Sequence, residues 1–190
     1  MKKIFISAIM ICFSVSGFAQ AGLSASDESQ HIKLKQEYTP QSVIMIGTSL
    51  NSSQNACTLM YGYVKKWGWY GKLKTNFNLN EDYSYETSDN SNAFWNGKVK
   101  KGRYSATIGT IFNMNGSLMA YGGLGYGKRW VEWGTVENQN IKRTDYSYKG
   151  IESEVGLLLS VKKFVISGGI STNLNKTSHS EANIAVGLKF

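Results

Sequence analysis

The stretch SEANIAVGLKF, residues 180–190, decides the fold of this chain. Every second residue in it is apolar, and the residues between are polar or small. Because successive side chains of a β-strand point to opposite faces, the stretch predicts a strand with one apolar face. The apolar face carries Ala182, Ile184, Val186, Leu188 and Phe190.

The other end of the sequence has the features of an export signal. Lys2 and Lys3 are followed by an apolar run over residues 4–15 and then by small residues up to Ala21. This pattern predicts a signal peptide over residues 1–21, cleaved after Ala19 or after Ala21. Residues 22–40 are polar and irregular, and we expect them to form a periplasmic lead-in to a single domain over residues 41–190. An exported chain with such a strand indicates the outer membrane.

The composition favours strands over helices. The chain has 20 glycines, one proline and 13% aromatic residues, and aromatic and β-branched residues suit a pleated surface. The mean hydropathy of −0.27 is low for a membrane protein, but only alternate residues of a barrel strand face lipid. Once the signal peptide is removed, Cys57 is the only cysteine, so an intramolecular disulfide is excluded.

The alternating pattern recurs along the chain, and the connections fall into two classes. We expect strands at residues 42–50, 57–65, 69–79, 103–113, 117–130, 148–161, 164–173 and 180–190. Tight turns at 65–68, 113–116 and 161–163 alternate with longer connections at 51–56, 80–102, 131–147 and 174–179. Outer-membrane barrels have short periplasmic turns and longer extracellular loops. The sequence therefore predicts an all-β fold, an eight-stranded antiparallel up-and-down transmembrane β-barrel in which strand 180–190 pairs with strand 42–50.

The chain resembles the family of small, eight-stranded bacterial outer-membrane β-barrels over about residues 42–190. The resemblance rests on the signal peptide, on the alternation of short and long connections and on the SEANIAVGLKF strand. The resemblance implies a location in the outer membrane of a Gram-negative bacterium, among outer-membrane lipid and lipopolysaccharide. It also implies that the barrel-assembly machinery recognises the C-terminal strand. Members of the family include structural anchors, adhesion and immune-evasion proteins, small channels and a few lipid-modifying enzymes.

If the apolar faces contact lipid, charges of both signs face the lumen. An eight-stranded lumen is only wide enough for side chains to fill, and buried charges are costly unless paired. We therefore expect a plugged lumen with paired charges. The facing of strands 42–50 and 57–65 is left open, because both of their faces carry apolar residues. The expected lumen charges are Lys72, Lys74, Arg103, Arg129, Glu152, Glu154, Glu181 and Lys189.

Aromatic residues gather near the ends of the predicted strands, as in the two interfacial belts of a membrane barrel. The alternative is a soluble, lipocalin-like exported barrel in which the same faces are exchanged and the aromatic rings pack a core. The expected belt residues are Trp67, Trp69, Phe112, Phe164 and Phe190 on the periplasmic side, and Phe77, Tyr104, Trp130 and Tyr148 on the outer side.

Several local patterns bear on function. The glycine run 123–128 lies inside a predicted strand, where glycine makes room for bulky neighbours, and lacks the following helix of a phosphate loop. Around His179, both serines are immediate neighbours and point away from its face, which argues against a lipid-modifying enzyme. No histidine, cysteine and carboxylate spacing resembles a metal site, and we expect no catalytic, cofactor-binding or metal-binding residues.

Two patterns favour interaction outside the cell. Basic residues approach the outer rim and suit phosphate groups of lipopolysaccharide: Lys98, Lys100, Lys101, Arg103, Lys128, Arg129, Lys142 and Arg143. The longest connection holds aromatic residues among small polar ones, a composition suited to recognition: Tyr83, Tyr85, Phe94 and Trp95. The first hypothesis is a non-enzymatic structural or surface-interaction barrel with an unknown extracellular ligand. A small ion or solute channel is the alternative, an enzyme using His179 is a third, and export argues against nucleic-acid binding.

Overall fold

The computed structural model describes residues 39–51, 55–88, 95–175 and 180–190, all within the compact unit Glu37–Phe190. The predicted signal peptide, most of the predicted lead-in, Phe94 and His179 lie outside the described residues. Within the described part, no helix is long and apolar enough to cross a membrane.

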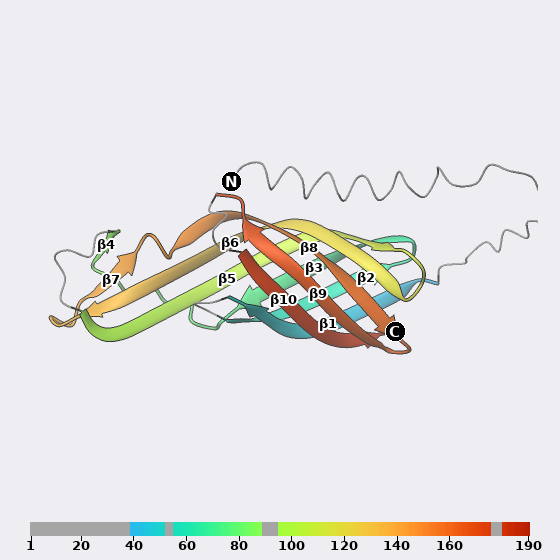
Figure 1. The fold of residues 1–190 in the computed structure, drawn as a ribbon, viewed down its shortest axis with the longest axis horizontal. Helices are drawn as coiled ribbons and strands as arrows, with labels where there is room; N and C mark the ends of the chain where they lie inside the picture. Colours follow the sequence, from blue (N-terminus) through green and yellow to red (C-terminus); the bar gives the residue numbers. More distant parts are fainter. Residues whose placement is uncertain (1–38, 52–54, 89–94, 176–179) are drawn as a thin grey trace, which may run out of the picture. The chain divides into compact units, whose positions relative to one another are not determined.

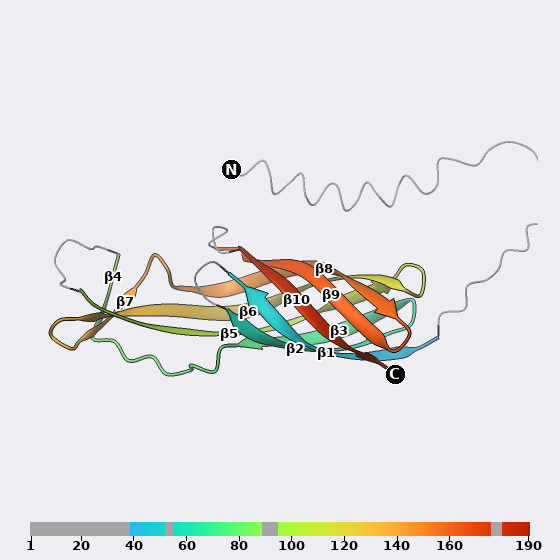
Figure 2. The ribbon, with the colours of Figure 1, turned by 60° about the horizontal axis from the view of Figure 1, so that its bottom comes forward.

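Eight antiparallel strands close into a barrel (Figures 1 and 2). The ring closes because the first and last strands pair, Val43 with Lys189 through Leu50 with Ala182, and because β6 pairs with β8. The predicted eight-stranded barrel and its closing pair are confirmed. The barrel strands are β1 (Gln41–Leu50), β2 (Ala56–Val64), β3 (Trp67–Thr75), β5 (Trp95–Asn113), β6 (Leu118–Thr135), β8 (Tyr148–Val161), β9 (Phe164–Asn173) and β10 (Ser180–Lys189).

The predicted tight turns lie at one end of the barrel and have local causes. In the β5–β6 turn, Gly116 has a φ of 82° and its amide donates to the side chain of Asn113 at 2.7 Å. The amide of Leu118 donates to the side chain of Asn115 at 2.7 Å. Glycine and asparagine suit such turns because they tolerate positive φ or bond their own backbone.

At the other end, β5 and β6 continue beyond the barrel and form a sheet with two short strands (Figure 1). β7 (Asn140–Arg143) pairs with the upper part of β6, and β4 (Tyr85–Thr87) pairs in parallel with β7. We name β4, β7 and the upper parts of β5 and β6 (Trp95–Lys101 and Trp130–Thr135) the extracellular sheet. The prediction of loops at 80–102 and 131–147 was wrong for these strands.

The third predicted strand, 69–79, ends early at Thr75. The side chain of Asn76 accepts a hydrogen bond from the amide of Arg103 at 2.9 Å, and its amide group donates to the carbonyl of Lys101 at 2.9 Å. Asparagine side chains compete in this way with the β-ladder. Phe77 then has a φ of 63°, which takes the chain out of the strand direction.

The barrel has an apolar outer surface, as a wall facing hydrocarbon requires. Residues such as Ile108, Val155 and Ile170 are 69%, 59% and 59% exposed and alternate with buried inward residues. The facing of β1 and β2, which the sequence left open, is now settled. Ile44, Ile46, Leu59 and Tyr61 face outward, while the intervening residues face the lumen.

The lumen is divided into two halves. Near the tight turns it holds an apolar cluster that includes Val64, Ile111, Met119, Leu158 and Val165. This cluster explains why β1 and β2 are apolar on both faces. Towards the other end, the lumen holds charged and polar side chains. The edge-to-face pair of Tyr70 and Tyr121, with ring centroids 5.4 Å apart, lies inside the barrel as well.

Glycines of β6 give room to these inward side chains, so adding a methyl group at Gly123 should destabilise the barrel. A Cβ at Gly123 would lie 2.5 Å from the carbonyl oxygen of Ile108 and 2.5 Å from the hydroxyl of Tyr70. We expect Gly123→Ala to lower the free energy of unfolding in lipid vesicles by about 1–3 kcal/mol.

The matched control is Gly71→Ala, because a Cβ at Gly71 would meet no atom within 4 Å. Its free energy of unfolding should stay within about 0.5 kcal/mol of the unaltered chain or rise slightly. Equal effects of the two substitutions in urea titrations would contradict the tight packing described for Gly123.

Candidate functional site: a basic pocket at the barrel rim

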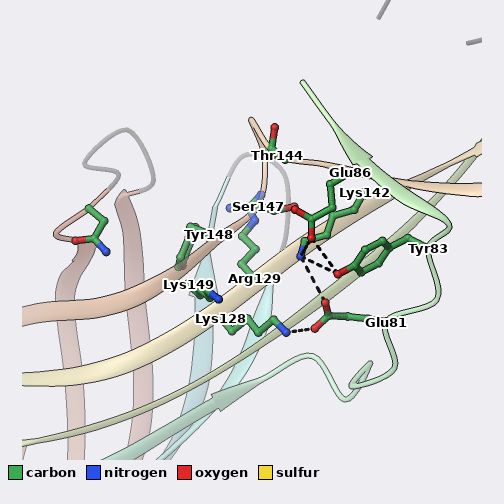
Figure 3. Close-up of a pocket in the computed structure, with 11 residues that line it drawn as sticks. Glu81, Tyr83, Glu86, Lys128, Arg129, Lys142, Thr144, Ser147, Tyr148 and Lys149 are labelled. Carbon is green, nitrogen blue, oxygen red and sulfur yellow. Dashed lines mark hydrogen bonds and ion pairs between the residues drawn. The ribbon is translucent and has the colours of Figure 1, made fainter. Parts of the chain in front are cut away.

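A cavity of about 410 Å³ lies where β6 separates from β8 (Figure 3). β6 pairs with β8 as far as Arg129 and Tyr148, and it pairs with β7 from Glu132 and Lys142 onward. The segment between β7 and β8 spans the gap where β6 changes its partner. The cavity lies at this gap, and we name it the rim pocket. Its lining is Glu81, Tyr83, Glu86, Lys128, Arg129, Lys142, Thr144, Ser147, Tyr148, Lys149 and Asn175.

Two lysines of the rim pocket are cross-strand partners. Lys128 of β6 lies directly opposite Lys149 of β8. By strand alternation both are on the outer face, two residues above the exposed side chains of Tyr126 and Ile151. Like charges placed directly opposite destabilise a sheet, so this position is suited to an anion that lies between the ammonium groups.

A small hydrogen-bonded cluster forms the extracellular side of the pocket (Figure 3). The ammonium of Lys142 donates to Glu86 at 2.8 Å and lies 3.6 Å from Glu81. The hydroxyl of Tyr83 donates to Glu86 at 3.0 Å, and Lys128 forms an ion pair with Glu81. These contacts tie the chain between β3 and β4 to β6 and β7, and so hold the pocket wall in place.

The two partners of this cluster shift each other's protonation. Hydrogen bonds from Lys142 and then Tyr83 lower the pKa of Glu86. Burial disfavours the charged form of Lys142, but the hydrogen bonds to Glu86 and Tyr83 outweigh it, so its pKa is raised. Because the folded-state pKa of Glu86 is lowered, its contribution is present at neutral pH and is lost as the pH falls through that lowered pKa.

The lumen side of the pocket is continuous with the charged half of the lumen. Tyr148 donates its hydroxyl hydrogen bond to Glu152 at 2.9 Å, and Arg129 is a buried cross-strand neighbour of Arg103. The pocket as a whole has four cationic side chains, Lys128, Arg129, Lys142 and Lys149, against the two carboxylates Glu81 and Glu86. Its net charge of +2 favours an anionic ligand.

Six of the predicted lumen charges meet in ion pairs. Lys72 lies 2.9 Å from Glu154, Lys74 lies 3.6 Å from Glu154 and 3.8 Å from Glu152, and Arg103 lies 3.3 Å from Glu152 and also pairs with Glu181. Their side chains are at most 3% exposed. With the apolar cluster below it, this network fills the lumen with side chains.

Lys189 was wrongly placed in this network. It pairs with Val43 near the tight turns, and eight residues separate it from Glu181, which corresponds to about 27 Å along a strand. Alternation correctly predicted the inward face but could not indicate at which end of the lumen the partners lie.

Two of the predicted belt residues were also wrong, because Trp130 is 0% exposed and Tyr148 is 7% exposed. The ring of Trp130 lies over Gly102 and packs edge to face with Tyr104, whereas Tyr148 points to Glu152. The remaining belt residues lie on the outer surface of the barrel strands or, like Phe77 and Phe190, in the chain just after a strand. They are Trp67, Trp69, Phe77, Tyr104, Phe112, Phe164 and Phe190.

The predicted recognition residues divide between several roles. Tyr85 is exposed on β4, while Tyr83 is a hydrogen-bonding partner within the rim pocket. Trp95 packs edge to face on Trp133 with ring centroids 5.1 Å apart. The guanidinium of Arg143 lies 4.9 Å from the Trp133 ring and 5.7 Å from the Trp95 ring. Cation–π contacts of this kind stiffen the extracellular sheet.

The sequence prediction included the rim cations Lys128, Arg129 and Lys142 but missed Lys149, Glu81 and Glu86. Lys149 lies within the predicted strand 148–161, and counting back by two residues from the outward Ile151 would have placed it on the outer face. The two glutamates carry no such signal. Glu81 reaches Lys128 through the path of the chain between β3 and β4, and Glu86 reaches Lys142 through the pairing of β4 with β7. Among the described residues, no group of three or more histidine, cysteine, aspartate or glutamate side chains could hold a metal ion.

Comparisons with known proteins show the fold. No protein-family model and no curated protein matches the chain. It is similar to the crystal structure of Ail, the attachment invasion locus protein of Yersinia pestis, in complex with the heparin analogue sucrose octasulfate. The TM-score is 0.56 and the identity 20%, over 80% of this chain and 99% of that chain.

Two further solved structures match with lower scores. The backbone structure of the Yersinia pestis outer membrane protein Ail in a phospholipid bilayer nanodisc has a TM-score of 0.48, at 20% identity over 80% of this chain and 100% of that one. Neisserial surface protein A has a TM-score of 0.36, at 10% identity over 79% of this chain and 94% of that one. The likeness to the Ail crystal structure, together with the apolar outer wall, shows a transmembrane β-barrel of the outer-membrane type.

Proposed function

We propose that the chain is a non-enzymatic surface-interaction barrel that binds sulfated or phosphorylated ligands through the rim pocket. The convergence of four cations on one cavity with only two carboxylates carries this proposal. Sulfate and phosphate groups accept short, charge-assisted hydrogen bonds from lysine and arginine, which are stronger than hydrogen bonds between neutral groups. The heparin analogue in the Ail complex is a ligand of this class, and it is therefore the probe that we choose.

The extracellular sheet supports an interaction role. β5 and β6 are 19 and 18 residues long, whereas β9 and β10 have ten residues each. The additional length extends a hydrogen-bonded sheet beyond the barrel, and rigid elements position binding groups more accurately than loops. Exposed side chains on it, such as Tyr85 and Val99, are available for contact.

The described residues give no support to the alternative functions. The lumen is filled by the ion-pair network and the apolar cluster, which disfavours a small channel. His179, the candidate residue of the enzyme hypothesis, lies outside the described residues. We also propose that β10, which closes the ring against β1, is the strand that the barrel-assembly machinery recognises.

The test of the rim pocket is a binding titration with sucrose octasulfate on the mature chain folded in detergent micelles. We expect the double substitution Lys128→Ala with Lys149→Ala to raise the Kd at least about tenfold, since each lost charge-assisted bond contributes about 1.5–3 kcal/mol. Affinity of the unaltered chain should fall as salt is increased, because ions screen the charges.

The matched control is Lys65→Ala with Lys66→Ala, which removes two exposed lysines at the turn between β2 and β3. It changes the net charge equally but leaves the rim pocket intact. Equal loss of affinity in both double variants would reduce the interaction to bulk charge and would contradict a site at the rim.

A further inference from the structure

A second cavity, of about 390 Å³, lies on the outer surface of the barrel. It crosses four neighbouring strands, β2, β3, β5 and β6, and we name it the outer groove. Its walls are apolar side chains that alternation directs outward, and its floor is formed by small residues. The walls include Leu59, Leu73, Ile108 and Leu124, and the floor includes Gly71 and Ala106.

The outer groove exists because small residues interrupt a surface of large ones. Gly71 pairs with Tyr61 on one side and with Ile108 on the other. A Cβ at Gly71 would meet no atom within 4 Å, so the space above it is open. Ala106 lies between Leu73 and Tyr126 in the next cross-strand row. An apolar hollow in a lipid-facing wall is complementary to an acyl chain.

The strand register places the β6 edge of the groove, at Leu124, on the same strand as Lys128 of the rim pocket and below it. Thr75, Tyr104, Lys128 and Lys149 form one continuous cross-strand row on the outer face. Leu124 is four residues below Lys128 on the same strand and the same face, which corresponds to about 14 Å along the strand and, with a strand tilt of about 35–45°, to about 10–11 Å of depth. One leaflet accounts for about 15 Å of the hydrocarbon core, so the groove and the lysine pair lie within the depth of a single leaflet.

We infer that the rim pocket binds the phosphate group of an outer-leaflet lipid and that an acyl chain of the same molecule occupies the outer groove. This inference rests on the proposed anion-binding role of the pocket. The height of the site brings the pocket next to the headgroups of membrane lipids. Lys149 is exposed immediately above the lipid-facing Ile151, at the level where phosphorylated headgroups lie. Tyr126 and Tyr104, exposed next to the lysines, are side chains suited to this interface.

The ligand that fits is a phosphorylated glycolipid with several acyl chains, the lipid portion of lipopolysaccharide. Its phosphate groups relieve the repulsion between Lys128 and Lys149, while Glu81 already neutralises part of their charge. The two ends of the molecule are recognised by different physical forces, charge at the rim and shape in the groove. Each can therefore be removed without altering the other.

The test uses the mature chain in detergent micelles and diphosphoryl lipid A, with native mass spectrometry to count bound lipid. Gly71→Leu fills the groove without changing the charge, and Lys128→Ala with Lys149→Ala removes the charge without filling the groove. We expect each to reduce lipid A occupancy at least about tenfold, and enzymatically dephosphorylated lipid A to bind as weakly to the unaltered chain.

Two controls keep the result interpretable. Gly168→Leu places the same side chain on the outer face of β9, where a Cβ also meets no atom within 4 Å, and Lys65→Ala with Lys66→Ala removes two lysines elsewhere. Both should bind lipid A like the unaltered chain. Sucrose octasulfate, which has no acyl chain, should bind the Gly71→Leu variant normally.

The outcomes separate this inference from the proposed function. If Gly71→Leu or dephosphorylation leaves lipid A occupancy unchanged while sucrose octasulfate still requires the two lysines, the lipid site is wrong and the anion pocket stands. If the unaltered chain binds neither probe, both are wrong. Loss of lipid A binding in Gly168→Leu as well would also overturn the groove as a specific site.

Discussion

Replacing Glu152 with alanine should lower the free energy of unfolding of the barrel by about 3–5 kcal/mol, the usual effect of removing one partner from a buried ion pair. The carboxylate lies 3.3 Å from Arg103 and 3.8 Å from Lys74, and it accepts the hydroxyl hydrogen bond of Tyr148 at 2.9 Å. Its loss leaves two cations in the closed lumen with less compensation, because the remaining carboxylates are shared with other partners.

The measurement is reversible unfolding in urea, with the chain folded in lipid vesicles and the folded fraction followed by tryptophan fluorescence. The matched substitution is Glu137→Ala, at the exposed hairpin between β6 and β7. It also replaces a glutamate with alanine, but at a solvent-exposed position, and it should change the free energy of unfolding by no more than about 0.5 kcal/mol. A Glu152→Ala effect below about 1 kcal/mol would mean that the network does not stabilise the lumen.

Replacing Val155 with arginine should destabilise the barrel by about 2–4 kcal/mol, as expected for a cation at the middle of the hydrocarbon layer. Val155 lies on the outer face near the middle of β8 and is 59% exposed. A soluble barrel would tolerate a charge at a position so exposed, since water would solvate it. The substitution therefore separates the membrane barrel from the lipocalin-like alternative.

Val136→Arg is the control, because Val136 is 63% exposed but lies at the tip of the β6–β7 hairpin, outside the barrel wall. The two valines have almost the same exposure, but Val155 faces lipid whereas Val136 faces water. We expect Val136→Arg to stay within about 0.5 kcal/mol of the unaltered chain in the same vesicles. Equal, small effects of both substitutions would contradict a lipid-facing position for Val155.

Strand alternation was enough to predict the barrel because the pattern extends over most of its strands. In β8 and β9 the predicted bounds, 148–161 and 164–173, agree with the structure, and the turn between β5 and β6 carries asparagine and glycine. β4 and β7 were missed because three and four residues are too few to show a period. β1 and β2 were ambiguous because half of the lumen is apolar, so both faces of these strands are buried in hydrocarbon or in the core.

The errors within the candidate site have a common origin. Trp130 and Lys189 have the residue type and spacing of a belt aromatic and a lumen charge, but their surroundings come from segments distant in sequence. Gly102 on β5 makes room for the ring of Trp130, and the register of β10 carries Lys189 to the opposite end of the lumen. Periodicity predicts the face on which a side chain lies, whereas register and loop paths determine what it meets.

The continuity of β5 and β6 has a mechanical consequence. The same two backbones form the barrel wall and the extracellular sheet, and their ladder runs from Trp95 opposite Thr135 to Asn113 opposite Met119. A force applied to the β6–β7 hairpin and directed away from the cell therefore acts along the strands. It loads many hydrogen bonds of the ladder at the same time. Such a shear geometry resists rupture better than one in which the bonds open one after another, so a cell held through this tip is anchored by the whole length of the ladder.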